Sequence, residues 1–348
     1  MHPWLLERLV DPVNRMPMRR DGQRLIAQDG ARYPVIDGVP VLLRADTAPT
    51  HRTALRSLRL AQWSQPETID LVTALNLPDA VKADIRSDIA AGDNPVHAAI
   101  RRLIPLTNGL AFRTVRAGTI PIPQFPRQGA GEWLLDIGCA WGRWSIAAQR
   151  AGFRPVGIDT ALGPLMAARR LALEHGAPID FVCADARFLP FRDHAFDRVF
   201  SYSTLQHFAD DDCAAALAEI ARVLAAGGSS LVQMANRAGI RSLWHQLRRG
   251  LREPVRFEVR YRSLARLREL FAAIGPTTIS VDCFFGLGLQ ASDIAHMRLA
   301  GRLATRASEF LKLAQRRVPV LLAVADSVFC ESAASRVSAP AAPPPRPA

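Results

Sequence analysis

Lysine is almost missing from this chain. Lys82 and Lys312 are the only lysines among its 44 basic residues, so the formal net charge of +12 comes almost entirely from arginine. A cationic surface of this kind can bind nucleic acid or an anionic membrane, because it releases counterions from phosphate. The arginine excess accompanies abundant alanine. We therefore interpret it mainly as a compositional bias with a solvated basic surface, and a polyanion site is the second interpretation.

Cysteine pairs are also missing. The five cysteines lie singly along the chain, and no C-x-x-C pair occurs. This spacing argues against both a metal cluster and a disulfide framework, so we expect no bound metal and a reducing compartment. The cysteines are Cys139, Cys183, Cys213, Cys283 and Cys330.

Long apolar runs are absent as well. No run reaches the roughly 18 residues that a membrane span requires. Glu7, Arg8 and Asp11 interrupt what would have to be the apolar core of a signal peptide. Hydrophobic residues make up 49% of the chain and charged residues 22%, which is typical of globular proteins. We expect a cytoplasmic protein with no integral membrane association.

The first part of the chain, residues 1–47, is predicted to be a small β unit. Short apolar runs alternate there with the turns Asp29-Gly30 and Asp37-Gly38. An Asp-Gly pair between such runs is a strong signal for a β-hairpin. The expected strands are 24–27, 32–36 and 39–43.

The remainder divides into three further parts. Residues 48–128 have a helical pattern that prolines interrupt, and they end in the proline-rich connector 120–126. Residues 129–335 are predicted to form the main domain, with an insertion at 237–262. The tail, 336–348, is too rich in proline and alanine to pack and is expected to be disordered.

The main domain alternates short apolar runs with helix-like segments. This is the pattern of an α/β domain, in which helices cover a mostly parallel sheet. Strands are expected near 133–137, 154–158, 179–183, 197–202, 229–234 and 278–285.

The strongest local signal is the segment from Leu134 to Ser145, where the apolar run ending at Ile137 leads into a turn with Gly138 and Gly142. Glycines at such a turn allow a ligand to approach the backbone, and the first amides of the following helix can donate hydrogen bonds. The sequence therefore predicts a cofactor site at this turn.

Two details indicate the type of cofactor. A dinucleotide site needs G-x-G-x-x-G, whereas this chain has Gly138, Ala140 and Gly142 at alternate positions, followed by Arg143. Asp136 would also place a carboxylate where two phosphates would have to lie. A cofactor that carries an ammonium and a sulfonium group, and no phosphate, fits this charge better.

These residues resemble the first motif of the class I S-adenosylmethionine-dependent methyltransferases, D-x-G-x-G-x-G, with Ala140 in place of the middle glycine. The similarity is to the type 11-like core of that class. It implies a Rossmann-like α/β fold, a seven-stranded sheet with helices on both faces, and S-adenosylmethionine as cofactor. Asp159 follows Gly138 by 21 positions, near the roughly 20 that separate turn and acid in a strand-helix-strand unit.

The resemblance extends over about 100 residues and assigns further positions. It implies that Asp159 binds the two ribose hydroxyls, that Asp185 reaches the adenine amino group, and that the amide of Ala186 faces the ring. Asp136 and Asp185 as helix N-caps, and Asp159 as a turn residue, are the structural alternatives. We interpret Cys139 as a packed residue rather than a nucleophile. The predicted cofactor-binding set is Asp136, Gly138, Cys139, Ala140, Gly142, Asp159, Asp185, Ala186 and Ser201.

His207 is the candidate catalytic residue. Methyl transfer from a sulfonium is an in-line displacement that needs no covalent residue, but a hydroxyl acceptor must lose a proton, and histidine is a common base. His207 follows the fourth expected strand of the domain. A structural role, in the pocket wall or beside the next helix, is the alternative. An Asn-Pro-Pro-Tyr motif and a cysteine after this strand are both missing, which argues against methylation of nucleobases.

The acceptor pocket is expected to be covered by the helices before Pro121 and by the insertion. The insertion carries an apolar stripe between arginines, and we expect this stripe to pack on its own domain while the basic face is solvated. Peripheral contact with an anionic membrane is the alternative. The stripe is Ile240, Leu243, Trp244, Leu247 and Leu251; the arginines are Arg237, Arg241, Arg248, Arg249 and Arg252.

The N-terminal unit is similar to a small zinc-ribbon-like family that accompanies many methyltransferases. The usual C-P-x-C is replaced by Asp11-Pro12-Val13-Asn14, so zinc is not expected and a scaffolding role is favoured.

Three functional hypotheses follow from these observations. The first is methyl transfer to an O or N atom of a small molecule. A methyltransferase acting on RNA or on a protein is the second, and a non-catalytic module that binds S-adenosylmethionine is the third.

Overall fold

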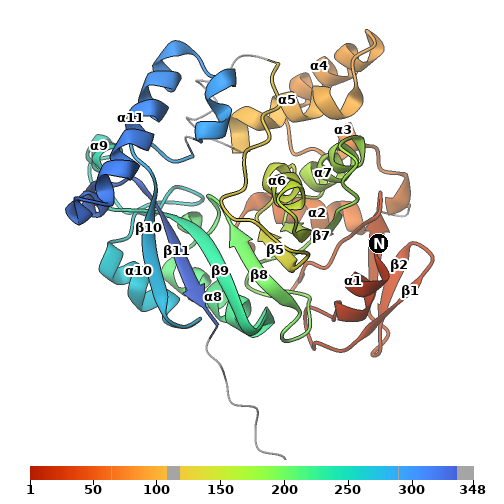
Figure 1. Cartoon of the computed structure of the whole chain (residues 1–348). Helices are drawn as coiled ribbons and strands as arrows, with labels where there is room; N and C mark the ends of the chain where they lie inside the picture. Colours follow the sequence, from red (N-terminus) through yellow and green to blue (C-terminus); the bar gives the residue numbers. More distant parts are fainter. Residues whose placement is uncertain (64, 108–117, 289, 335–348) are drawn as a thin grey trace, which may run out of the picture.

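The computed structural model describes residues 1–63, 65–107, 118–288 and 290–334; the tail predicted to be disordered lies outside this part. At the centre of the molecule is a seven-stranded sheet with the order β10-β11-β9-β8-β5-β6-β7 (Figure 1). Strands β5 to β9 pair in parallel, and β11 is antiparallel to both of its neighbours. The strands are β5 Trp133–Ile137, β6 Arg154–Asp159, β7 Asp180–Cys183, β8 Phe196–Ser201, β9 Leu224–Ala235, β10 Thr277–Cys283 and β11 Ser327–Ala333.

The predicted α/β fold with a seven-stranded sheet is confirmed. Successive residues of β5 point to opposite faces: Leu135 and Ile137 join one apolar cluster, and Leu134 joins another. Helices α8 (Asp210–Val223) and α10 (Leu264–Phe271) cover the first face, and α6 (Arg143–Arg150) and α7 (Leu162–Glu174) cover the second. Burial on both faces explains why the central strands read as continuous apolar runs.

The helical segment before the main domain packs on α7. Its helices α2, α3 and α5 all contact α7, so the segment extends the second layer of helices. Asp70 caps α3 by accepting a hydrogen bond from the amide of Thr73 at 2.9 Å. The elements are α2 Arg52–Ala61, η1 Pro66–Thr68, α3 Leu71–Ala74, α4 Asp79–Ala90 and α5 Pro95–Thr107.

The N-terminal unit is a four-stranded antiparallel sheet preceded by a short helix. It consists of α1 (Pro3–Arg8), β1 (Met18–Asp21), β2 (Arg24–Ala27), β3 (Arg32–Ile36) and β4 (Val39–Pro40). The predicted third strand is shorter than expected, because the next residues leave this sheet and meet the edge of the large one. There Val41 bridges Cys183, and the amide of Leu42 donates to the Cys183 carbonyl at 2.8 Å.

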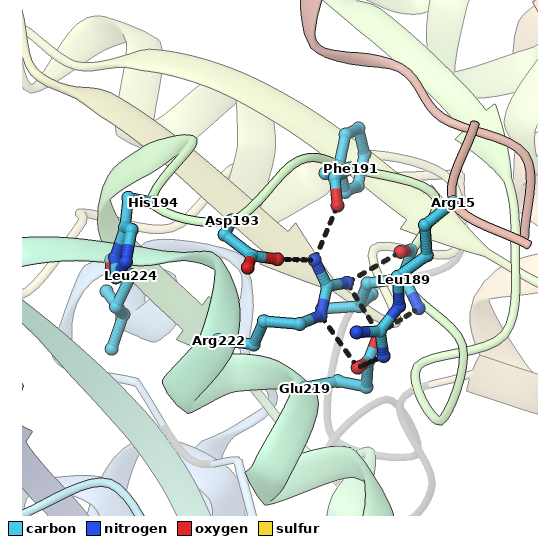
Figure 2. A network of polar contacts seen from close by, with 8 residues as sticks. All are labelled: Arg15, Leu189, Phe191, Asp193, His194, Glu219, Arg222 and Leu224. Carbon is cyan, nitrogen blue, oxygen red and sulfur yellow. Dashed lines mark hydrogen bonds and ion pairs between the residues drawn. The ribbon is translucent and has the colours of Figure 1, made fainter. Parts of the chain in front are cut away.

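Polar contacts also join the N-terminal unit to the main domain. Figure 2 shows Arg222 of α8 donating to the carbonyls of Leu189 and Phe191 and to the carboxylate of Glu219, which also pairs with Arg15 at 2.9 Å. Buried apolar residues of the unit, among them Leu5, belong to the same clusters as the main sheet. The unit is therefore held by docking rather than by a core of its own.

Helix α9 (Ile240–Arg248) corrects one expectation about the insertion. Its apolar stripe does not pack on the domain: Ile240, Leu243, Trp244, Leu247 and Leu251 are 46% to 66% exposed. The inward face is polar. The amide of Ser242 donates to Asp326 Oδ1 at 2.7 Å, and Gln246 Nε2 donates to the Arg237 carbonyl at 2.8 Å. Buried hydrogen-bond partners, which helical periodicity does not reveal, thus decide which face is inside.

The remaining elements are η3 (Leu205–His207), which lies between β8 and α8, and three elements after β10. These three are η4 (Ala291–His296), α11 (Leu299–Gln315) and η5 (Pro319–Val324). Of the helices in the described residues, none is both long and apolar enough to cross a bilayer.

Candidate active site

A cavity of about 1030 Å³ lies at the carboxyl ends of the parallel strands. One wall is formed by the ends of β5, β6 and β8 and by the residues that follow them. The opposite wall is formed by α9 and residues 257–261, and residues 50–53 and 103–107 contribute to a third side. Ligands of open α/β sheets bind at this edge. Both segments expected to cover the acceptor pocket therefore lie around the cavity.

The turn after β5 is packed closely against the side chain of Thr204. Gly138 has φ +75°, and a Cβ atom there would lie 2.1 Å from Thr204 Oγ1, so only glycine fits. Ala140 also has a left-handed φ of 48°. Its amide donates to Asp159 Oδ2 at 3.0 Å, while Asp159 Oδ1 accepts from the amide of Ala161 at 2.9 Å. Asp159 thus links the ends of β5 and β6 and lines the cavity.

Asp136 lies behind this turn and is buried. It accepts a hydrogen bond from Ser145 Oγ at 2.6 Å. Burial, with a smaller contribution from the charge of Asp159, raises the pKa of the Asp136 carboxyl to about 7. Burial also raises the pKa of Asp159, against the opposing effect of the amides of Ala161 and Ala140. A positively charged ligand would favour the ionised form of both groups, so the pair suits a cationic cofactor.

Of four other predicted cofactor residues, two line a cavity and two fix neighbouring elements of the fold. Ala186 lines the large cavity, and Cys139 lines a side recess of about 50 Å³ beside the same turn. Burial raises the pKa of Cys139 well above its ordinary value, so the group is a thiol at neutral pH. Gly142 is the N-cap residue of α6. The buried Ser201 donates to the Ile137 carbonyl at 2.9 Å, which ties β8 to β5.

Asp185 is paired within its own loop. Both of its oxygens accept from the guanidinium of Arg187, at 3.1 Å and 2.8 Å, and Arg187 also pairs with Asp212. The residues that line the cavity at this loop are Ala184 and Ala186. The prediction that Asp185 reaches the adenine amino group stays a prediction.

His207 ends η3 and lines the cavity. Its Nδ1 donates to the Phe257 carbonyl at 2.9 Å, and the ring stacks on Phe257 at a centroid distance of 4.3 Å. Because a carbonyl only accepts, the proton of the neutral ring lies on Nδ1 and the lone pair on Nε2. Burial lowers the pKa of His207 to about 4, so at neutral pH the ring is uncharged and able to accept a proton.

The sequence did not identify which arginines face the cavity. Arg241, Arg248 and Arg249 all line it from α9 and the residue after it. Among the described residues, none of these three guanidinium groups forms an ion pair with a carboxylate, whereas Glu258, which also lines the cavity, pairs with Arg252. Tyr202 lines the neighbouring region and donates to Asp282 Oδ2 at 2.7 Å. The arginines were visible in the sequence as a cluster, but helical periodicity did not show their direction.

Comparison with known proteins gives a match for the central part of the chain. Residues 134–228 match a family described as the methyltransferase domain. This part of the chain is therefore similar to methyltransferase domains. The cofactor of such a domain is S-adenosylmethionine, in agreement with the carboxylate of Asp159, which lines the cavity, and with the buried Asp136 behind the turn.

Individual relatives agree with this domain. The chain is 35% identical to a demethylmenaquinone methyltransferase of Thermus thermophilus over 140 residues, 40% of this chain and 60% of that protein. It is 31% identical to a ubiquinone biosynthesis O-methyltransferase of Chelativorans sp. over 115 residues, 33% of this chain and 45% of that protein. Because the first three matches cover only 36% to 60% of the relatives' own length, they identify the methyltransferase domain and not the acceptor.

Among solved structures, the chain is similar to phosphoethanolamine N-methyltransferase 2 of Haemonchus contortus in complex with S-adenosyl-L-methionine. The identity is 18%, the TM-score is 0.41, and the overlap covers 61% of this chain and 50% of that one. This likeness is too small to carry an argument about the acceptor.

Proposed function

We propose that the chain transfers the methyl group of S-adenosylmethionine to an O or N atom of a small molecule. The observation that carries this proposal is the continuity of the cavity. The same space of about 1030 Å³ is lined by Gly138, Ala140 and Asp159 at one end and by His207 and α9 at the other. A cofactor and an acceptor can therefore meet within one cavity.

The cofactor end would be held by the residues after β5 and β6. S-adenosylmethionine supplies an activated methyl group on a positively charged sulfur. Asp159 would accept hydrogen bonds from the ribose, and the turn from Gly138 to Gly142 would allow close approach of the backbone. Asp136, Cys139, Asp185, Ala186 and Ser201 complete the proposed set, and of these Asp136 and Ser201 would act by fixing the ends of β5 and β8.

The acceptor end favours a molecule with apolar and anionic parts. Leu103 and Leu106 of α5 line one side of the cavity, and the three arginines at α9 line another. Guanidinium groups without a carboxylate partner are suited to a carboxylate, phosphate or phenolate oxygen. The demethylmenaquinone and ubiquinone-pathway relatives support a small-molecule acceptor.

His207 is the proposed base for a hydroxyl acceptor. Its Nε2 carries the lone pair and can take the proton as the oxygen attacks the methyl group. Its low pKa makes it a weak base. It therefore suits an acceptor whose own hydroxyl is acidic, such as a phenol, better than an aliphatic alcohol.

A turnover assay tests the proposal. Formation of S-adenosylhomocysteine would be followed with panels of phenols, amines and carboxylates, and in parallel with total RNA and with a protein extract. We expect product only with members of the small-molecule panel, and loss of that product in Asp159→Ala. Methylation of RNA or protein with an inert small-molecule panel would contradict the proposal. Because counterion release makes RNA binding depend steeply on salt, affinity that is flat from low to physiological salt would also argue against RNA.

We also propose a cytoplasmic location, in line with five unpaired cysteines, all buried as free thiols.

A further inference from the structure

Large apolar side chains are exposed mainly in two segments of the described chain. In a folded monomer such side chains normally occur singly, and a concentration of them indicates an interaction surface. Helix α9 and the residue Leu251 carry one group; helix α11 and η5 carry the other. The exposed fractions are Ile240 49%, Leu243 46%, Trp244 49%, Leu247 64% and Leu251 66% in the first, and Leu299 71%, Leu303 57%, Phe310 70%, Leu313 60%, Val318 45%, Val320 72% and Val324 37% in the second.

The two groups belong to adjoining elements. Asn236 Nδ2, just before α9, donates to the carbonyls of Ala323 and Ala325, both at 2.8 Å, at the end of η5. The amide of Ser242 in α9 donates to Asp326. Figure 1 shows α9 beside the blue helices of α11 and η5 on the same side of the molecule. We call these exposed residues of α9, α11 and η5 the apolar surface.

Basic residues predominate in the segments that carry the apolar surface, although Arg252 pairs with Glu258 at 2.7 Å. Residues 237–252 contain five arginines and no acidic residue. Residues 298–317 contain five arginines and a lysine, and their one acidic residue, Glu309, already pairs with Lys312 at 3.1 Å. Whatever covers the apolar surface must therefore accept both apolar side chains and a cationic rim.

We propose that the apolar surface docks on an anionic lipid bilayer. An amphipathic helix with a basic face binds at the interface, where apolar side chains enter the acyl region and arginines meet phosphate groups. Trp244 has the amphipathic ring that is common at this depth. A second copy of the chain is a poorer occupant, because a twofold contact would bring the two arginine-rich rims together.

Docking would connect the bilayer with the acceptor end of the cavity. The inward side of α9 contributes Ser242, His245 and Arg249 to the cavity wall, while its outward side carries the apolar stripe. A bilayer on that stripe would lie one helix away from the acceptor. This consequence rests on the proposed function; the docking itself does not.

Vesicle co-sedimentation tests the docking. The full chain would be mixed with vesicles of phosphatidylcholine alone, or of phosphatidylcholine and phosphatidylglycerol in equal amounts, without cofactor or acceptor. We expect binding to the anionic vesicles, weakened by salt. The double variant Leu247→Ser with Phe310→Ser should bind about tenfold less, since two exposed apolar side chains are removed from the membrane-facing surface.

A matched control separates the apolar surface from general hydrophobicity. Leu55→Ser with Leu173→Ser removes two side chains that are 43% and 51% exposed elsewhere, and it should bind like the wild type. Thermal unfolding of both double variants checks that they fold. Equal binding of the Leu247/Phe310 variant and the wild type, or no binding to anionic vesicles, would overturn the proposal. So would a stable dimer in light scattering that the same variant dissociates. Because the readout needs no turnover, its outcome is independent of the methyltransferase assay.

Discussion

The cofactor end and the acceptor end of the cavity are built in different ways. At the cofactor end, Gly138, Ala140 and Asp159 belong to one strand-helix-strand unit, and a hydrogen bond from Ala140 to Asp159 closes it. At the acceptor end, residues 50–53, 103–107 and 241–261 come together from distant parts of the chain. A unit that is local in sequence can be identified from a short motif. A wall assembled from distant segments depends on which face each helix buries, and this is decided by tertiary contacts.

The largest effect is expected from a side chain at the cofactor turn. Gly138→Ala would place a Cβ against Thr204 and should destabilise the fold by about 3 kcal/mol or more, with loss of cofactor binding. Gly227→Ala is a matched control, because Gly227 has the same φ of +75° and nothing within 4 Å of the added Cβ. It should cost only the left-handed strain, about 1 kcal/mol. Denaturant unfolding measures both, and equal losses would show that the contact with Thr204 is unimportant.

The second prediction tests the acceptor end of the cavity separately from the cofactor end, by the kinetics of a His207 variant. His207→Ala should leave the affinity for S-adenosylmethionine unchanged and lower turnover of a hydroxyl acceptor by about 100-fold. In the wild type at saturating cofactor, protonation of His207 removes the base, so activity should be flat above about pH 5 and fall around pH 4. Steady-state rates across this range check both points. Unchanged turnover in the variant would assign His207 a structural role in the pocket wall.

The third effect concerns the ribose contact. Asp159→Ala should weaken S-adenosylmethionine binding by about 1 to 3 kcal/mol, because two hydrogen bonds to a charged acceptor are lost. Calorimetric titration gives the affinity, and the melting temperature shows whether the β5 turn survives the loss of the Ala140 contact. A folded variant with wild-type affinity would remove Asp159 from the site.

The fourth prediction concerns the proton on the Asp136 carboxyl group and its effect on cofactor binding. In the free protein the pKa of Asp136 is about 7, whereas its ordinary value is 3.8. The folded state thus keeps this proton up to a higher pH than the unfolded state does. The contribution of Asp136 to stability therefore falls as pH rises from about 4 to 7. A cationic cofactor favours the carboxylate, so its affinity should rise with pH up to about 7 and then level off. Titrations between pH 5 and 8 should show this slope in the wild type and not in Asp136→Asn.

The smallest effect is a gain in stability. Ala140 has φ 48°, a conformation that costs a residue with a Cβ about 1 kcal/mol. Ala140→Gly restores the usual glycine of the motif and should raise the free energy of unfolding by somewhat less than this, because glycine gains freedom in the unfolded chain. Differential scanning calorimetry measures the change. A clear loss of stability would mean that the Ala140 methyl group makes a packing contact that outweighs the strain.

The same contrast explains how much the sequence could predict. The strands from β5 to β9 were predicted because they are buried on both faces and read as apolar runs. Strand β1 was missed, since Arg19, Arg20 and Asp21 are exposed and give no alternation. Strand β11 was missed because the run around Phe329 is short, although it completes the seven-stranded sheet.

The site shows the same limits. The turn and Asp159 were found from spacing, whereas the pairing of Asp185 with Arg187 depends on side-chain geometry that the motif does not encode. The wrong expectation for α9 arose because its buried face is polar and bound to Asp326, a residue more than 80 positions away. At the N-terminal unit, Asp11 accepts a hydrogen bond from Tyr33 at 2.8 Å and Asn14 donates to Asp29 at 2.6 Å. Side-chain hydrogen bonds thus occupy the positions where the zinc-ribbon-like family has cysteines, and the resemblance to that family stays a prediction.

The most direct test of the account is a pair of calorimetric titrations on the wild-type chain, one with S-adenosylmethionine and one with NAD. The carboxylates of Asp136 and Asp159 predict one site for the cationic nucleoside and no measurable heat from the dinucleotide, whose phosphates they would repel. Binding of NAD, or no binding of S-adenosylmethionine, would contradict the account.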